Sequence, residues 1–169
     1  DSVSDDARSE SLAESESASD IVANPGVASP SVGHVAKVHV IQARNLTAAD
    51  VGGTSDPYAV LSVNGDRENG EKTQVVSATL SPNWQETLVF RNLRENDVLT
   101  VEVFDYDYIG SDDALGSINL TVRAAMALFI KDGESGSWFT LEGADAGTGE
   151  IQLGFAFHPR PVLTKSDDS

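Results

Sequence analysis

A series of short segments with alternating apolar and polar residues runs from residue 35 to residue 160 and constrains the fold most strongly. Successive side chains of a β-strand point to opposite faces, so this alternation is typical of strands that bury one face. Turn-forming Gly, Pro, Asn or Asp residues separate the segments. The sequence therefore predicts an all-β fold, an eight-stranded antiparallel β-sandwich. The predicted strands are AKVHVIQA, PYAVLSV, EKTQVVS, NWQETLVF, DVLTVEVFD, LGSINL, SWFTL and GEIQLGFAF.

One short helix is predicted before the seventh strand, in the segment TVRAAMALFIKDG (residues 121–133). Thr121 is a suitable N-terminal cap, and Gly133 is a suitable end. The apolar residues recur at spacings of three and four, which places them on one helix face that can cover a gap in the core. They are Val122, Ala125, Met126, Phe129 and Ile130.

The two ends of the chain differ in composition from the strand-rich part. Residues 1–34 are rich in Ser, Ala and acidic residues and contain no aromatic residue. Such a segment cannot bury enough surface to offset the entropy of ordering, so we interpret it as a disordered acidic linker. Its Ser–Glu repeats would also suit phosphorylation. Residues 161–169 are interpreted as a disordered tail, which leaves one domain over residues 35–160.

Charge and cysteine content exclude several classes of function. The formal net charge of −16 argues against nucleic acid as a partner, because phosphate binding needs a basic surface. The absence of cysteine excludes disulfides, thiolate metal sites and cysteine nucleophiles, and it fits a cytoplasmic, reducing location. The longest apolar run, residues 124–130, is far shorter than the roughly 20 residues of a membrane-spanning helix.

Carboxylates crowd into two segments that follow predicted strands. The segment FDYDYIGSDDALG (104–116) contains four aspartates around the apolar pair Tyr108–Ile109, and NLTAADVGGTSDPY (45–58) contains Asp50 and Asp56. Two such loops at one end of a sandwich would bring their carboxylates together, and like-charge repulsion would raise some of the pKa values. Oxygen ligands on flexible loops suit calcium better than magnesium.

The acidic segments allow other interpretations. An EF-hand starting at Asp105 is excluded, because Ile109 stands at its fifth position and Gly116 replaces the bidentate Glu at its twelfth. Paired carboxylates of a glycosidase would need a deep cleft, for which the sequence offers no support. Composition alone leaves a plain solvated acidic loop as an alternative of equal weight.

Three stretches closely resemble the signature stretches of the C2 domain family: ARNLTAADVGGTSDPYAVLSV, TQVVSATLSPNWQETLVF and LTVEVFDYDYIGSDDALGSI. The resemblance covers about residues 36–158. C2 domains are β-sandwich modules, many of which bind calcium and then phospholipid. The resemblance implies two or three calcium ions and identifies the ligand positions as Asp50, Asp56, Asp105, Asp107 and Asp113. Asp112 has no ligand role in the family pattern, and we interpret it as solvated.

The order of the strands resembles one of the two family topologies. Only one strand precedes the first acidic loop, and a full strand, GEIQLGFAF, closes the domain. This resembles the phospholipase type, in which the final strand fills the place that the first strand takes in the other type.

The resemblance implies calcium-dependent binding to anionic phospholipid membranes, as a module that targets or tethers a larger protein. Bound cations would cancel most of the carboxylate charge, and the apolar loop tips Val51, Tyr108 and Ile109 would then enter the lipid. The alternative for Ile109 is packing onto its own loop. The alternative for the domain is a calcium-independent protein-interaction module, and further protein partners are expected through other domains of the parent protein.

A second lipid site and an enzymatic activity receive less support. Some relatives hold a phosphoinositide headgroup with strand lysines and a tryptophan. Lys72 and Trp84 match that pattern, but Gln74 replaces a second lysine, and packing beside Pro82 in a strand explains Trp84 better. No enzymatic activity is predicted, because the histidines have no Ser or acid at the spacing of a catalytic triad, and GESGS (133–137) lacks the final Gly of a nucleophile elbow.

Overall fold

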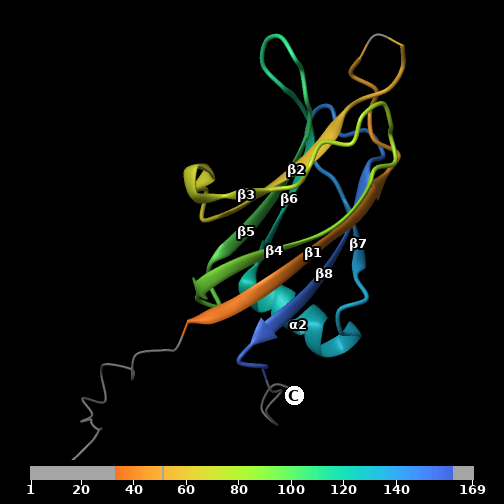
Figure 1. Ribbon diagram of the computed structural model, residues 1–169. Helices are drawn as coiled ribbons and strands as arrows, with labels where there is room; N and C mark the ends of the chain where they lie inside the picture. The colour runs from red at the N-terminus through yellow and green to blue at the C-terminus, as the bar shows by residue number, and fades with distance from the viewer. Residues whose placement is uncertain (1–32, 51, 162–169) are drawn as a thin grey trace, which may run out of the picture. The chain divides into compact units, whose positions relative to one another are not determined.

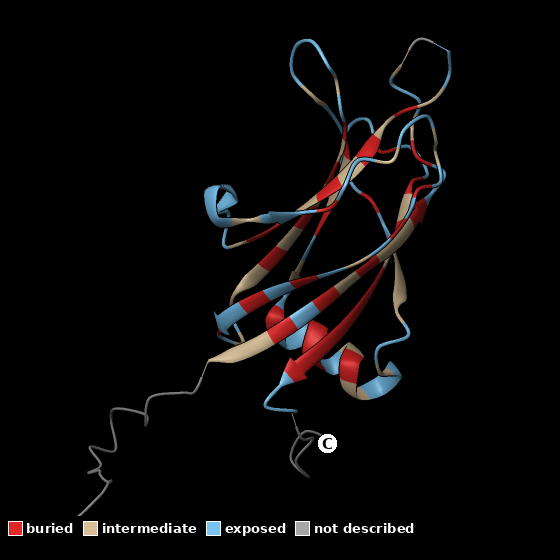
Figure 2. Cartoon of the chain, viewed as in Figure 1, coloured by how far each residue is buried: buried red, intermediate tan, exposed pale blue. Residues whose placement is uncertain are grey.

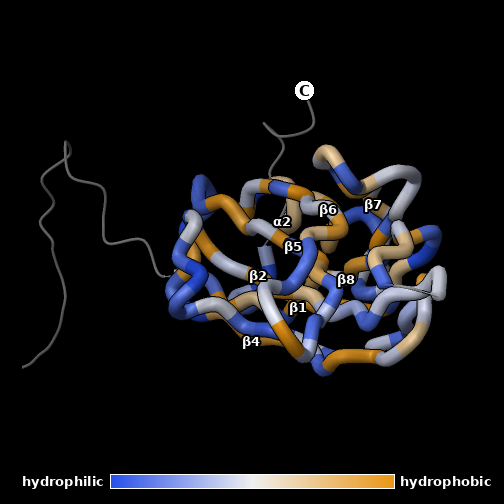
Figure 3. Tube along the Cα trace, turned by 90° about the horizontal axis from the view of Figure 1, so that it is seen from above, coloured by the Kyte–Doolittle hydropathy of each residue, from blue (hydrophilic) through white to orange (hydrophobic). Residues whose placement is uncertain are grey.

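The computed structural model describes residues 33–50 and 52–161, and they form the β-sandwich that the sequence predicts. One four-stranded antiparallel sheet contains, in spatial order, β4 (Asn83–Leu93), β1 (His34–Arg44), β8 (Glu150–His158) and β7 (Ser137–Thr140). The other contains β3 (Glu71–Lys72), β2 (Pro57–Val63), β5 (Val98–Asp105) and β6 (Asp113–Thr121). Viewed from the loop end, β2, β5 and β6 lie on one side, and β4 and β1 lie on the other (Figure 3).

The predicted linker and tail fall mostly outside the described residues. Of residues 1–34, the structure describes only Gly33 and His34, and His34 begins β1. Of residues 161–169, it describes only Pro161. The interpretation of the two ends therefore stays a prediction.

Alternating burial along the strands builds the core. In β5, every second residue is buried. Figure 2 also shows separate buried bands along β1 and β4, whereas the last part of β8 is buried almost continuously. The inward residues of β8 pair with those of β1, as in Val38 opposite Phe155 and Val40 opposite Leu153. All four side chains are at most 2% exposed. The period of two therefore identified the buried face of these strands correctly.

The position of the last strand confirms the topological prediction. β8 lies between β1 and β7 and pairs antiparallel with both. The first and last strands of the domain are thus neighbours in one sheet, as expected for the phospholipase-type order.

The third strand is much shorter than predicted. Only Glu71 and Lys72 pair with β2, although the sequence suggested a strand over EKTQVVS. Beyond them, backbone N–H groups of Thr73, Val76 and Thr79 donate to carbonyls of the β2 side at every third residue. A β-ladder needs a bond at every second residue, so this segment forms an irregular loop that follows β2.

The predicted helix lies between β6 and β7 as α2 (Val122–Asp132). The Thr121 hydroxyl accepts the N–H of Ala124 at 3.1 Å, and Gly133 ends the helix with φ of 68°. Four of the five predicted apolar positions are buried: Val122, Ala125, Met126 and Phe129. A further short 3-10 helix, η2 (Arg67–Asn69), connects β2 and β3. No helix within the described residues is long and apolar enough to cross a membrane.

Candidate functional site

Three loops lie together at one end of the sandwich, and α2 lies at the opposite end (Figure 1). They connect β1 to β2, β3 to β4, and β5 to β6. The first and third carry the aspartates predicted as calcium ligands. The sequence predicts no calcium ligand in the middle loop, residues 73–82.

A tight turn in the first loop positions Asp50. The N–H of Asp50 donates to the carbonyl of Thr54 at 2.9 Å, and the N–H of Gly53 donates to the carbonyl of Asp50 at 3.2 Å. Gly52 and Gly53 have φ of 110° and 85°, values that glycine adopts without the steric cost of a Cβ. The pair of glycines therefore lets the chain fold back after Asp50.

Asp56 joins the first loop to the third. Its N–H donates to Oδ1 of Asp105 at 2.7 Å, and its carbonyl accepts the N–H of Tyr106 at 2.9 Å. Asp105 is the last residue of β5 and lies opposite Pro57 in the ladder with β2. Strand pairing thus fixes the two loops against each other at this point.

The five predicted ligands form two groups that share Asp105. In each group, one oxygen per carboxylate lies within 4.8 Å of the others. The first group is Asp50, Asp56 and Asp105, and the second is Asp105, Asp107 and Asp113. Asp113 begins β6 directly opposite Asp105, which explains how strand register brings the second group together.

The carboxylates perturb one another. Burial, together with the neighbouring carboxylates of Asp50 and Asp56, raises the pKa of Asp105, although the N–H of Asp56 opposes this shift. Partial burial and the carboxylates of Asp113 and Asp105 raise the pKa of Asp107. Both shifts mean that burial and the neighbouring carboxylates disfavour the charged forms of Asp105 and Asp107.

A hard divalent cation fits this donor set. Asp105 is fully buried, and its Oδ2 atom has no hydrogen-bond partner among the described residues. A buried carboxylate oxygen without a partner is costly, and a cation would supply the missing interaction. The donors are carboxylate oxygens, which calcium and magnesium prefer over softer metals.

The middle loop supports Asp56 through a strained residue. The N–H of Ala78 donates to Oδ1 of Asp56 at 2.7 Å, and Ala78 has φ of 54°. An Ala in this left-handed region is sterically unfavourable, so the surrounding contacts must hold it. Ala carries no turn signal, which is why this contact could not be inferred from the sequence.

Asp112 differs from its interpretation as a solvated residue. Its Oδ1 accepts the N–H of Asp107 at 2.8 Å, and its Oδ2 accepts the hydroxyl of Tyr58. The side chain is only partly exposed. The family pattern could not indicate this role, because the partner Tyr58 lies 54 positions earlier, in β2.

The apolar tip of the third loop is exposed. Tyr108 is 89% exposed and Ile109 is 86% exposed. Ile109 therefore does not pack onto its own loop. The remaining predicted tip residue, Val51, lies outside the described residues.

Lys72 and Trp84 belong to different sheets. Lys72 is exposed in β3, whereas Trp84 in β4 is 6% exposed and donates its indole N–H to the carbonyl of Pro57 at 3.3 Å. A buried indole cannot contact a headgroup, so Trp84 is a core residue. Lys72 pairs with Val60 of β2, and Val60 pairs in turn with Glu102 of β5, so a carboxylate lies on the same face of the sheet as Lys72.

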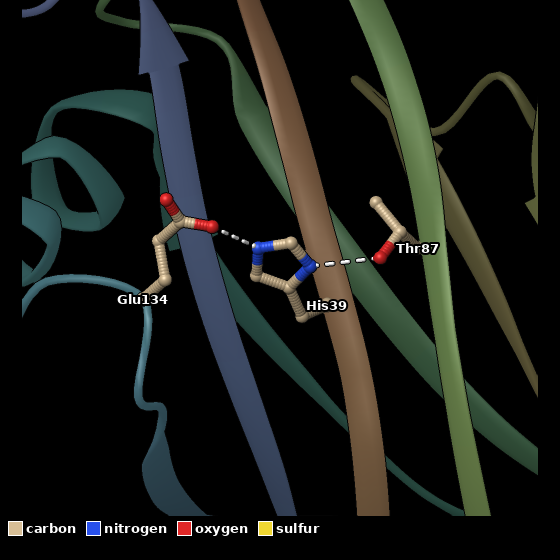
Figure 4. A network of polar contacts seen from close by, with 3 residues as sticks. All are labelled: His39, Thr87 and Glu134. Atoms are coloured by element: carbon tan, nitrogen blue, oxygen red, sulfur yellow. Dashed lines mark hydrogen bonds and ion pairs between the residues drawn. The ribbon is translucent and has the colours of Figure 1, made fainter.

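A histidine network lies outside the loop end. His39 of β1 contacts Thr87 through Nδ1 and Glu134 through Nε2, both at 2.8 Å (Figure 4). Because a carboxylate only accepts, Nε2 donates to Glu134. His39 and Thr87 are directly opposite in the β1–β4 ladder, so cross-strand pairing explains their contact. The network ties the segment after α2 to the first sheet.

These features define a β-sandwich binding module with an acidic, cation-suited cluster at one end. The family model for the C2 domain matches residues 34–141, which shows that the chain belongs to the C2 domain family. Tricalbin-1 of Saccharomyces cerevisiae is 34% identical over 128 residues, covering 73% of this chain and 10% of that protein. Synaptotagmin-3 of Arabidopsis thaliana is 41% identical over 81 residues, covering 47% of this chain and 15% of that protein.

Solved structures agree with this fold. A calcium-bound structure of two C2 domains of Extended-Synaptotagmin 2 matches with a TM-score of 0.62 and 26% identity, over 76% of this chain and 46% of that one. A single C2 domain of plant Extended Synaptotagmin 1 matches with a TM-score of 0.63 and 22% identity, over 79% of this chain and 98% of that one. The chain thus corresponds to one domain of longer relatives.

Proposed function

We propose that this domain binds calcium through its two aspartate groups and then binds anionic phospholipid membranes. The observation that carries the proposal is the buried Asp105, which both groups share and whose Oδ2 has no partner among the described residues. Support from similarity comes from the calcium-bound Extended-Synaptotagmin 2 structure. Two ions are expected from the two groups, and a third is compatible with the family pattern.

The aspartates prevent membrane binding until their charge is compensated. Each charge near an anionic leaflet is worth about 1 kcal/mol, so five ionised carboxylates would be repelled by several kcal/mol. When bound, calcium would supply positive charge and coordination positions for lipid phosphate oxygens. Asp50, Asp56, Asp105, Asp107 and Asp113 would hold it.

The exposed tip of the third loop supplies the apolar contribution. Tyr108 and Ile109 are exposed in the loop between β5 and β6, which also carries Asp107. Burying a side chain of this size is worth about 1.5–3 kcal/mol at most. Two such side chains give only a few kcal/mol, which is too little for firm binding while the carboxylates are repelled. The tip therefore contributes once the charge is compensated.

The lengths of the relatives support the proposal that the domain recruits a larger protein to membranes. The chain spans about a tenth of Tricalbin-1 and 15% of Synaptotagmin-3. We propose a cytoplasmic module that associates peripherally with membranes and has no catalytic activity of its own. A calcium-independent protein-interaction module is the alternative, and the acidic surface would then contact a protein partner.

Vesicle co-sedimentation tests the proposal. The wild-type domain should pellet with phosphatidylserine-containing vesicles in calcium and stay in the supernatant in chelator. The variant Asp105→Asn with Asp107→Asn should stay in the supernatant in both conditions while keeping its fold. Equal pelleting of the wild type in calcium and chelator would contradict calcium dependence, and calcium-dependent pelleting of the double variant would contradict the ligand assignment.

A further inference from the structure

We infer that Asp112, together with Tyr58, is a positioning pair that sets the geometry of the second aspartate group. The inference rests on the proposed calcium site and adds two residues to it. Neither residue belongs to the ligand groups found among the described residues. Both act through other residues and do not contact the ion themselves.

Asp112 closes the third loop across its base. Its Oδ1 accepts the N–H of Asp107, so the chain cannot open between positions 107 and 112 without breaking this bond of 2.8 Å. The next residue, Asp113, is itself a member of the second group. One side chain thus fixes the backbone at two ligands, Asp107 directly and Asp113 through the peptide bond.

Tyr58 anchors this closure to the sheet. Its hydroxyl donates to Oδ2 of Asp112, and its ring stacks on Phe104 with ring centres 5.7 Å apart. Tyr58 and Phe104 are also directly opposite in the β2–β5 ladder. Phe104 immediately precedes Asp105, so Tyr58 connects the third loop to the strand end that carries the shared ligand.

The chemistry of the pair suits a positioning role. Both oxygens of Asp112 accept protein hydrogen bonds, whereas Oδ2 of Asp105 has no partner among the described residues. Because an ionised carboxylate only accepts, the Tyr58 hydroxyl is the donor in this contact. Partners of this kind orient metal ligands, and their removal weakens metal binding by about 10–100-fold.

These contacts predict that loss of Asp112 affects calcium binding by the second aspartate group only. The first group is held by the turn at Asp50 and by the N–H of Ala78 on Asp56, and neither contact involves Asp112. Loss of Asp112 should therefore weaken the calcium ion held by the second group and leave the other largely unchanged. A general loss of stability would weaken both.

The matched variants are Asp112→Ala and Asp112→Asn. Asn removes the charge but keeps both contacts, because its Oδ1 can accept from Asp107 and its amide can donate to the Tyr58 oxygen. Calcium titration by calorimetry should show one ion weakened about 10-fold or more in Asp112→Ala and by no more than about 3-fold in Asp112→Asn. Thermal unfolding in chelator shows separately whether each variant is folded.

Tyr58→Phe supplies a second test that keeps the ring stack on Phe104. It should weaken the same ion in the wild-type background and have no further effect in Asp112→Ala, because the pair acts as one unit. This variant also covers the case in which Asp112→Ala does not fold.

The outcomes separate this inference from the proposed function. Absence of calcium binding by the wild type would overturn the proposed function and, with it, the inference. Calcium binding that is unchanged in Asp112→Ala, or equally weakened in Asp112→Ala and Asp112→Asn, would overturn the positioning role alone. The second result would show that Asp112 acts through its charge or as a ligand.

Discussion

Replacing Asp105 by Asn should stabilise the domain in chelator and abolish its stabilisation by calcium. The side chain is fully buried, its Oδ1 accepts the N–H of Asp56, and its Oδ2 has no partner among the described residues. Asn can keep the first contact. At the position of Oδ2 it places an amide that can donate to the nearby carboxylates of Asp50 and Asp56.

The size of the effect follows from the group that is removed. A buried polar atom left without a partner costs about 1–3 kcal/mol, and repulsion by Asp50 and Asp56 acts in the same direction. At about 4 °C per kcal/mol for a domain of this size, the midpoint of thermal unfolding in chelator should rise by about 4–12 °C.

The pH dependence of this difference gives a second check. Because the pKa of Asp105 is raised in the folded protein, its contribution to stability is fully present below its ordinary pKa and is lost as the pH rises through the raised value. The gap between variant and wild type should therefore be small near pH 4 and widen toward pH 7. All other titrating groups are common to both proteins.

Thermal unfolding followed by circular dichroism, in chelator and in calcium, measures both effects. A variant that is less stable than the wild type in chelator at pH 7 would show that Asp105 is already well compensated by protein groups. That result would remove the main structural reason for a cation at this position.

Three further predictions concern the surroundings of the site. Replacing both Tyr108 and Ile109 by Ser should weaken calcium-dependent vesicle binding by about 10–100-fold, because a few kcal/mol of apolar burial is lost. Calcium affinity without lipid should stay unchanged. Unaltered vesicle binding would exclude insertion of this tip. Ala78→Gly should raise the free energy of unfolding by about 0.5–1 kcal/mol, because Gly adopts a positive φ without strain and keeps the N–H that donates to Asp56. A lower unfolding temperature would contradict the strain at Ala78. Trp84→Phe should lower the free energy of unfolding by about 1 kcal/mol, because the hydrogen bond to the Pro57 carbonyl is lost. Binding to phosphoinositide vesicles should not change. A selective loss of that binding would restore Trp84 as a headgroup ligand.

Much of the fold could be predicted from periodicity because one face of each long strand is buried. The alternation in β8 and the spacing in α2 identified buried faces, and the position of β8 followed from the number of strands before the first loop. The third strand was overestimated. Its apolar residues suggested a ladder, but the chain bonds to β2 at every third residue.

The sequence singled out the five aspartates that the structure gathers at the loop end, but it did not indicate the contacts that hold them. Asp105 and Asp107 stand two apart at a strand end, and the family pattern marks the remaining three predicted ligands. The supports are different in kind: Ala78 contributes a backbone N–H, and Asp112 acts through a tyrosine from another strand. Such contacts depend on loop conformation and on sheet pairing, which composition and spacing do not encode.

Calcium titration with and without phosphatidylserine vesicles connects the two halves of the proposed function in a single experiment. If the aspartate groups and the membrane bind calcium together, vesicles must tighten calcium binding by the same factor by which calcium tightens vesicle binding. We expect two or three ions per domain and an apparent affinity that rises about 10-fold or more in the presence of vesicles. Absence of calcium binding, or the same calcium affinity with and without vesicles, would contradict a calcium-dependent membrane site.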